Sequence, residues 1–277
     1  MAPSTSVRAL ALSCHPVPSL GVTALTAGLA ALASLPLGRG LLVTAAVFTG
    51  QLSIGWSNDY IDAERDRAVR RSDKPVASGL VAPRIAGIAA LVALIGNLAL
   101  SAALSWPGGG AVLVITACGW AYNLGVKATV LSWLPYAIAF GMLPAVVTLS
   151  ASTPRWPAAW TLAAGALLGV AAHLANVLPD LSADAATGIR GLPHRLGAKA
   201  TALAGALILL AASAVILFGP GGEPGWWRWS GFAAALLVAG TAAASAYRDP
   251  TSPRFFRATI LIAAMDLAFF ALSGTNL

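Results

Sequence analysis

Two acidic stretches of the chain share one spacing of oxygen-bearing side chains. The sequences NDYIDAERD at 58–66 and NVLPDLSAD at 176–184 both follow the pattern N-x-x-x-D-x-x-x-D. On a helix, side chains four residues apart lie on nearly the same face, because four residues overshoot one full turn by only about 40°. Carboxylate and amide oxygens without Cys or His favour hard cations, above all Mg²⁺ or Ca²⁺. The predicted metal ligands are Asn58, Asp62, Asp66, Asn176, Asp180 and Asp184.

The repetition of this spacing distinguishes a metal site from an ordinary charged loop. One cluster alone could be a solvated loop in which Asp59, Glu64 and Asp73 balance nearby arginines. Two such clusters facing each other would repel unless a cation lay between them. Mg²⁺ bound through a few carboxylates usually completes its shell with water and substrate phosphates. The duplicated pattern therefore predicts a metal–phosphate site, with Pro179 breaking the second helix near its end.

Basic side chains follow both clusters and could hold the phosphate oxygens that a metal does not reach. Arg is suited to bidentate contact with phosphate, and Lys to a point contact. Aromatic faces in the neighbouring apolar segments could stabilise a cation on the ligand, and Tyr122 is the first choice among them. Together these features fit a lipidic chain that carries a diphosphate. The basic residues are Arg70, Arg71, Lys74, Lys127, Arg190 and Arg195.

The segments that must position these residues are strongly apolar. Of the 277 residues, 58% are hydrophobic and 10% are charged, and the mean hydropathy is +0.78. Soluble domains carry roughly 25% charged residues, so this composition predicts an all-α polytopic membrane protein in a single domain, 1–277. About nine transmembrane helices are expected, in two related four-helix halves. The apolar windows are 20–37, 41–57, 85–104, 111–126, 130–150, 157–178, 200–219, 229–247 and 258–273.

The distribution of Lys and Arg predicts the orientation. With the N-terminus in the cytoplasm, 14 of the 17 basic residues lie on the cytoplasmic side and only Arg39, Arg155 and Arg228 lie outside. Both acidic clusters and their loops are then cytoplasmic, and the C-terminus is external. The segment 20–37 is interpreted as a first membrane helix, with no cleaved signal. The net charge of +7 is a topology signal with attraction to lipid headgroups, and does not indicate nucleic-acid binding.

Three segments resemble the UbiA superfamily of intramembrane prenyltransferases. NDYIDAERDRAVRRSDKPVASG, from 58, looks like the first aspartate-rich motif of that family, including the trailing D-K-P. DLSADAATGIRGLPHRLG at 180–197 looks like the second motif, with Arg190 where the family usually has Lys. AYNLGVK at 121–127 resembles its Y-x-x-x-x-K segment. The resemblance implies helices around a central cavity, in the plasma membrane if the source is bacterial.

The resemblance also implies an Mg²⁺-dependent reaction. A prenyl diphosphate loses pyrophosphate to give an allylic cation, which an electron-rich acceptor within the membrane then attacks. Asn58, Asp62, Asp66, Asp180 and Asp184 would hold Mg²⁺ on the diphosphate, with Asn176 as a helper. Lys74, Lys127 and Arg190 would bind the diphosphate, with Arg71 and Tyr122 beside it. Asp59 is a candidate for removing the final proton.

The acceptor is expected to be neutral. Family members that use 4-hydroxybenzoate-like acids tend to carry a basic residue two turns before the first motif. That position is Gln51 here, and the window 41–57 has no Lys or Arg. A buried carboxylate without a cationic partner is costly. Neutral phenols, quinol-like rings, lipid alcohols or the prenyl chain itself are therefore the expected nucleophiles.

The residues described above leave two other functions open. The superfamily includes terpene cyclases, in which double bonds of the same molecule capture the cation. A transporter is the alternative from another class, because polar groups inside membrane helices often line ion pathways. Such groups can equally form helix–helix hydrogen bonds. The polar residues in question are Gln51, Asn97, His173 and Asp266.

Overall fold

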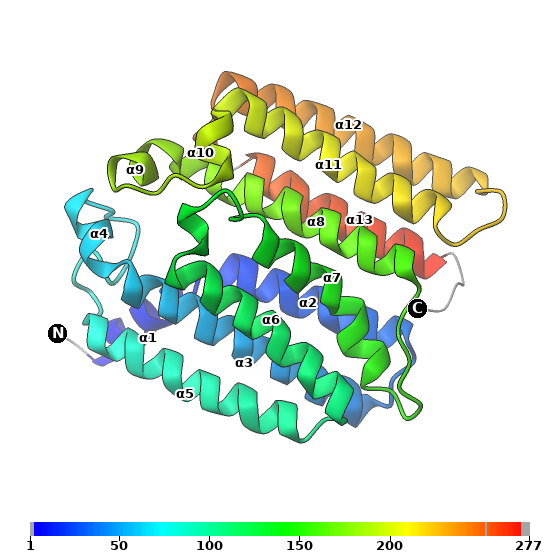
Figure 1. The fold of residues 1–277 in the computed structure, drawn as a ribbon, viewed down its shortest axis with the longest axis horizontal. Coiled ribbons are helices and arrows are strands. Elements are labelled where there is room, and N and C mark those ends of the chain that lie inside the picture. Colours follow the sequence, from blue (N-terminus) through cyan, green and yellow to red (C-terminus); the bar gives the residue numbers. More distant parts are fainter. Residues whose placement is uncertain (1–2, 253, 273–277) are drawn as a thin grey trace.

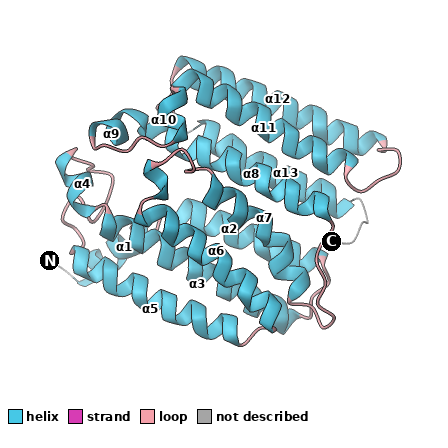
Figure 2. Ribbon diagram, viewed as in Figure 1, coloured by secondary structure: helices cyan, strands magenta, loops and turns pink. Residues whose placement is uncertain are grey.

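A computed structural model describes residues 3–252 and 254–272, and every regular element within these residues is a helix (Figure 2). The all-α prediction is therefore confirmed. The elements are α1 Pro3–Leu12, α2 Pro16–Leu32, α3 Leu37–Ile61, α4 Ala63–Ala68, α5 Pro83–Ala102, α6 Trp106–Leu124, η1 Val126–Ala128, α7 Leu134–Leu149, α8 Ala159–Val177, η2 Leu178–Asp180, α9 Leu181–Ala186, α10 Leu192–Leu196, α11 Ala198–Phe218, α12 Trp226–Arg248 and α13 Arg254–Leu272.

Nine of the described helices coincide with the nine apolar windows. By length and hydropathy, five stretches could cross a membrane: α3, α5, α8 with its extension to Ala186, α11 and α12. The helices α2 and α7 are apolar but shorter, so the number of nine crossings stays a prediction. The last residue of the window 258–273 lies outside the described residues, as do the two ends of the proposed domain 1–277.

Six of the long helices form a ring. α3 packs against α2 and α6, α7 joins α6 to α8, and α13 lies against both α8 and α2, which closes the ring. α5 packs outside α3, while α11 and α12 pack outside α8 and α13 (Figure 1). A cavity lined by all six ring helices lies inside, as the resemblance implies. The symmetry of two related halves stays a prediction.

Small residues allow the ring helices to approach closely. A Cβ at Gly169 of α8 would collide with the backbone oxygen of Tyr136 in α7, and one at Gly165 would collide with that of Phe140. Close contact at small residues is typical of helix packing in membranes, where apolar burial between helices supplies little driving force. The two backbones therefore touch directly, and the larger side chains of α7 are free to face the cavity.

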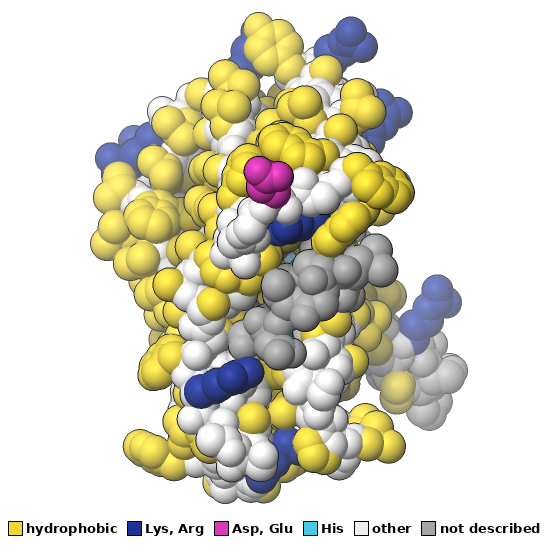
Figure 3. All heavy atoms as spheres, turned by 90° about the vertical axis from the view of Figure 1, so that its right-hand side faces the viewer, with side chains coloured by type: hydrophobic (Ala, Val, Ile, Leu, Met, Phe, Trp, Pro, Cys, Tyr) yellow, Lys and Arg dark blue, Asp and Glu magenta, His cyan; other side chains and the backbone are white. Residues whose placement is uncertain are grey.

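The outer surface suits a hydrocarbon environment. Ile85, Ile88, Leu91, Val92 and Ile95 of the peripheral helix α5 are all exposed, at spacings that place them on one broad face. The end remote from α4 and α9 is mostly hydrophobic, with separate basic side chains and little acid (Figure 3). The charged elements α4, α9 and α10 gather at the opposite end of the bundle (Figure 1). These surfaces are those of an integral membrane protein with one polar end.

The two acidic motifs have the same local construction. In the first, Asn58 lies in the last turn of α3, Asp62 stands at the break after it, and Asp66 lies in the short helix α4. In the second, Asn176 lies in the last turn of α8 and Asp180 ends the 3₁₀ turn. That turn contains Pro179, as predicted, and Asp184 follows in the short helix α9. Each motif thus passes from a long helix through a break to a separate short helix.

Candidate active site

The two acidic motifs meet at one polar cavity. Arg71 Nη1 lies 3.1 Å from Asp180 Oδ1, so the loop after the first motif contacts the second motif directly. The cavity has a volume of about 220 Å³ and takes its lining from both motifs and from the α6–α7 connection. Its polar lining is His15, Asn58, Asp59, Asp62, Arg65, Asp66, Arg71, Asp73, Lys74, Tyr122, Lys127, His173, Asn176, Asp180, Asp184 and His194.

Asp62 is the most heavily paired carboxylate of the cavity. Lys127 Nζ donates to both of its oxygens at 2.6 and 2.7 Å, and Arg65 Nη2 lies 2.6 Å from Oδ2. Gly125, with φ of 154°, ends α6, and the following turn η1 brings Lys127 to the cavity. Burial lowers the pKa of Lys127, and the adjacent Asp62 offsets this only in part. This ammonium is therefore held close to its carboxylate partner in a poorly solvated place.

Lys74 connects the other two acids of the first motif. Its Nζ donates to Asp66 Oδ2 at 2.9 Å and lies 3.4 Å from both Asn58 Oδ1 and Asp59 Oδ1. Burial lowers the pKa of Lys74, but Asp59 and Asp66 outweigh that effect, so the net pKa is raised. The D-K-P loop thus folds back over the motif and places a firmly protonated cation among its oxygens.

The second motif is less tightly paired. Asp180 is 39% exposed and contacts Arg71, while His194 Nε2 stands 3.6 Å from Asp184 Oδ2, beyond hydrogen-bond distance. Burial lowers the pKa of His194, which favours its neutral form. Asn176 is exposed to the cavity space. These oxygens are consequently more available to a new partner than those of the first motif.

The charge of the polar cavity is negative. Six aspartates and four Lys or Arg side chains line it, which leaves a formal charge of −2 with the histidines neutral. Among the described residues, no three acidic, His or Cys side chains already converge as a metal cage. A bare diphosphate would be repelled here, whereas a divalent cation that brings its own phosphate ligands would be attracted. The donor set, all oxygen at the acids, fits Mg²⁺.

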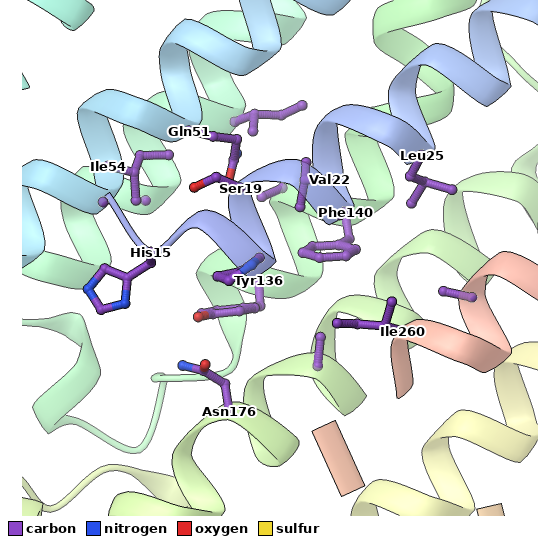
Figure 4. Close-up of a pocket in the computed structure, with 18 of the residues that line it drawn as sticks. His15, Ser19, Val22, Leu25, Gln51, Ile54, Tyr136, Phe140, Asn176 and Ile260 are labelled. Atoms are coloured by element: carbon purple, nitrogen blue, oxygen red, sulfur yellow. The ribbon is translucent and has the colours of Figure 1, made fainter. Parts of the chain in front are cut away.

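A second, apolar cavity adjoins the polar one. It measures about 400 Å³ and lies inside the ring of helices, where no Lys, Arg, Asp or Glu among the described residues lines it. Figure 4 shows Tyr136, Phe140 and Gln51 facing this space, with His15 and Asn176 at one end and Leu25 toward the other. Four residues line both cavities and so mark the seam between them: His15, Asn58, Tyr122 and Asn176.

Aromatic rings stand at that seam. Tyr122 and Tyr136 form an edge-to-face pair with ring centroids 5.3 Å apart, and His173 lies 5.7 and 5.1 Å from them. Ring faces at this distance from a phosphate site could stabilise a carbon cation as it leaves the diphosphate. Tyr122, chosen from the sequence, lies at the seam, and its role toward a cation stays a prediction.

Three of the polar groups considered as an ion pathway form bonds within the bundle. Asn97 Nδ2 donates to Ala46 O at 2.7 Å, and Ser213 Oγ donates to Asp266 Oδ2 at 3.0 Å. His173 Nε2 lies 3.1 Å from Ser132 Oγ. These are interhelical or helix–loop contacts, which fits the structural interpretation and not a transport pathway. Gln51 differs, since it lines the apolar cavity.

The polar cavity is lined by most, but not all, of the site residues predicted from the sequence. Arg190 is exposed and is absent from the described lining of both cavities. His15 and His194 were not chosen, yet both line the polar cavity, and Arg65 contacts Asp62 where the sequence suggested only charge balance. The available signal for His15 was weak: it is one of three histidines and immediately precedes the first apolar helix.

Comparisons with known proteins identify the family. Residues 19–271 match the model of the UbiA prenyltransferase family. The chain is 31% identical over 258 residues to digeranylgeranylglyceryl phosphate synthase of Halobacterium salinarum, covering 88% of this chain and 90% of that protein. The apo structure of a UbiA homolog from Aeropyrum pernix K1 superimposes with a TM-score of 0.73 at 20% identity, over 91% of this chain and 97% of the other.

A UbiA homolog from Archaeoglobus fulgidus, bound to DMAPP and Mg²⁺, also superimposes with a TM-score of 0.73. The identity is 15%, over 96% of this chain and 98% of that one. At 15% identity, the likeness to this structure shows the fold alone, and it extends over almost the whole of both chains. The family match over most of the chain carries the assignment of the activity class. The chain belongs to the UbiA prenyltransferase family and is a membrane prenyltransferase.

Proposed function

We propose that the protein transfers a prenyl group from an allylic prenyl diphosphate to an uncharged reacting group, the hydroxyl of a lipid acceptor, in an Mg²⁺-dependent reaction. The observation that carries this proposal is the pair of adjoining cavities. One is polar with a formal charge of −2, and the other is larger and lined without charged side chains. A prenyl diphosphate has the same two parts, a charged head that takes Mg²⁺ and an apolar chain.

The polar cavity would hold the metal and the diphosphate. Mg²⁺, when bound, stabilises the charge that develops on the leaving diphosphate. Lys127, Lys74 and Arg71 now contact carboxylates, and they can transfer part of that contact to phosphate oxygens once Mg²⁺ neutralises the acids. Tyr122 faces the cation at the seam, and the exposed Arg190 could meet the diphosphate from the cavity mouth. The proposed metal ligands are Asn58, Asp62, Asp66, Asp180 and Asp184, with Asn176 as a helper.

The apolar cavity supports a neutral reacting group. An acidic aromatic acceptor would bring a carboxylate beside Gln51, where the described lining offers no cation to pair with it. The Halobacterium salinarum relative is named for a glyceryl phosphate product, which favours a lipid alcohol among the neutral nucleophiles. A phosphate on such an acceptor would have to lie in the polar cavity. The active-site loops are proposed to face the cytoplasm, within one membrane domain.

Purified protein in detergent, incubated with Mg²⁺ and labelled C10, C15 and C20 diphosphates, tests this proposal. Each diphosphate is supplied with and without a panel of lipid alcohols, glyceryl phosphate lipids, phenols and 4-hydroxybenzoate, and products are identified by mass. We expect a prenylated alcohol that forms only when the acceptor is present. A cyclic hydrocarbon or alcohol formed without acceptor would assign the protein to the cyclases instead. Efficient prenylation of 4-hydroxybenzoate would contradict the neutral acceptor.

A further inference from the structure

His15 is held at the seam between the two cavities by the turn that joins α1 to α2. Its backbone has φ of 55°, in the left-handed region that non-glycine residues seldom adopt. Trp56 Nε1 donates to Leu10 O at 2.8 Å, and Ser19 Oγ donates to Cys14 O at 2.9 Å. On the other side, α3 presents Gly55, where any Cβ would collide with the backbone of Cys14. The turn is thus held against α3 at Leu10 and Cys14, and Ser19 ties it to the first turn of α2.

The imidazole of His15 is bonded to a buried carboxylate. Its Nε2 lies 3.0 Å from Asp59 Oδ1, and Asp59 is only 1% exposed. An ionised carboxylate can only accept, so Nε2 carries the proton and Nδ1 carries a free lone pair in the neutral ring. Among the described residues, Nδ1 has no hydrogen-bond partner. Asp59 Oδ1 is shared with Lys74 Nζ at 3.4 Å, and Asp59 is absent from the apolar cavity.

Among the four described residues at the seam, His15 alone carries a basic ring nitrogen with a lone pair. On the function proposed above, the reaction takes place there, because the diphosphate end of the prenyl chain would meet the acceptor where the two cavities join. Asn58 and Asn176 are amides that do not accept a proton, and the phenol of Tyr122 is itself an acid. His15 is the remaining member of the set, and its lone pair is the free one.

We propose that His15 is the general base that removes the hydroxyl proton of the acceptor, and that Asp59 orients it. This rests on the function proposed above. The allylic C–O bond breaks and its electron pair leaves with the diphosphate. The acceptor oxygen uses a lone pair to form the new C–O bond. Its O–H bond breaks, the electron pair stays on oxygen, and the proton goes to Nδ1 of His15. The resulting imidazolium is paired with the Asp59 carboxylate.

His15→Ala tests the proposal, with Thr23→Ala as the matched control. Thr23 lies in α2, the helix that His15 immediately precedes. Within the described residues its hydroxyl donates only to Ser19 O, and it is absent from the described lining of both cavities. A positioned base contributes about 10²- to 10⁴-fold, so His15→Ala should slow transfer to an aliphatic alcohol by at least about 10²-fold. A non-hydrolysable prenyl diphosphate analogue should bind as tightly as it does to the wild type.

Two further measurements separate a base from a structural residue. The first compares a lipid alcohol with its fluorinated analogue of equal length, whose hydroxyl is more acidic. The deficit of His15→Ala should shrink with the more acidic acceptor, because a base matters less when the proton leaves readily. The second adds free imidazole, which should restore part of the activity of His15→Ala and leave that of Thr23→Ala unchanged.

The outcomes are distinct. A deficit that depends on acceptor acidity, with diphosphate binding retained and imidazole rescue, supports His15 as the base. Full activity of His15→Ala, or an equal deficit for both acceptors with weakened diphosphate binding, overturns it while wild-type transfer still stands. If the wild type itself forms only cyclic products without an acceptor, the proposed function fails and this inference fails with it.

Discussion

Lys127 and Asp62 are 65 positions apart, yet the ammonium of one donates to both carboxylate oxygens of the other at 2.6 and 2.7 Å. The pair joins the α6–α7 connection to the break after α3, inside the cavity proposed to accept the diphosphate. Charge-assisted bonds of this kind contribute about 1.5–3 kcal/mol. Lys127 therefore has a structural partner and also lines the cavity in which we propose that the diphosphate binds.

Lys127→Ala should weaken diphosphate binding. Loss of one charge-assisted bond corresponds to about a 10- to 100-fold rise in KM for the prenyl diphosphate. Steady-state kinetics at saturating acceptor measure it, and Lys127→Arg is the control that keeps the charge. If kcat and KM of Lys127→Ala equal those of the wild type, Lys127 is a topology anchor and not a phosphate ligand.

Chelation should abolish turnover. With a formal charge of −2, the polar cavity cannot hold a diphosphate without a cation. Excess EDTA should therefore remove product formation, and added Mg²⁺ should restore it. Product mass is followed during titration of the chelator, with a Zn²⁺-only arm as the control for metal type. Undiminished turnover in excess chelator would contradict the proposed site.

Asp62→Ala and Asp180→Ala should both lose activity but differ in stability. Removing one metal ligand should cost at least about 10²-fold in kcat. Removing Asp62 also leaves Lys127 buried without its carboxylate, which costs about 3 kcal/mol, whereas loss of the half-exposed Asp180 costs about 1 kcal/mol or less. Thermal unfolding in detergent measures the difference. Equal midpoints for the two variants would show that the Asp62–Lys127 pair does not stabilise the fold.

Asp73→Asn should destabilise the protein at neutral pH only. The hydrogen bonds from Arg71 Nε and Nη2, at 3.0 and 2.9 Å, hold the pKa of Asp73 below its usual value. A carboxylate whose pKa is lowered by folding contributes stability above its unfolded pKa and loses it as the pH falls through the folded pKa. Asp73 is largely exposed, so the expected loss at pH 7 is about 1–3 °C in Tm. A Tm difference that persists at pH 2 would contradict this origin.

The sequence predicted the presence of the long helices better than it predicted the residues at which they begin and end. Apolar windows find the long helices because each must cover a bilayer core, but the window 20–37 runs past the end of α2 at Leu32 and misses α1. The short polar helix α1 has no apolar run to reveal it. The i, i+4 pattern identified the acids, and Pro179 the break in the second motif, since both are local properties.

The partners of those acids could not be predicted. His15 meets Asp59 across 44 positions because the α1–α2 turn folds against Gly55 of α3, and no spacing rule encodes such a contact. Lys74 follows the first motif closely in the sequence, and the D-K-P loop also brings it back to Asp66 in space. Sequence proximity therefore predicted this contact. Arg190 also lies close to a motif in the sequence, but it is exposed, in the loop between α9 and α10.

The described lining of the apolar cavity is uncharged, so all formal charge lies at the end formed by the polar cavity. On the proposed function, an allylic cation would then stay beside its leaving group whatever the length of the chain behind it. A longer prenyl group would extend toward Leu25, which lies away from His15 in the cavity (Figure 4). Leu267 also lines this cavity and stands against Gly28 of α2. We therefore expect residues at the far end of the apolar cavity, and not those at the seam, to limit the length of the prenyl chain that the protein accepts.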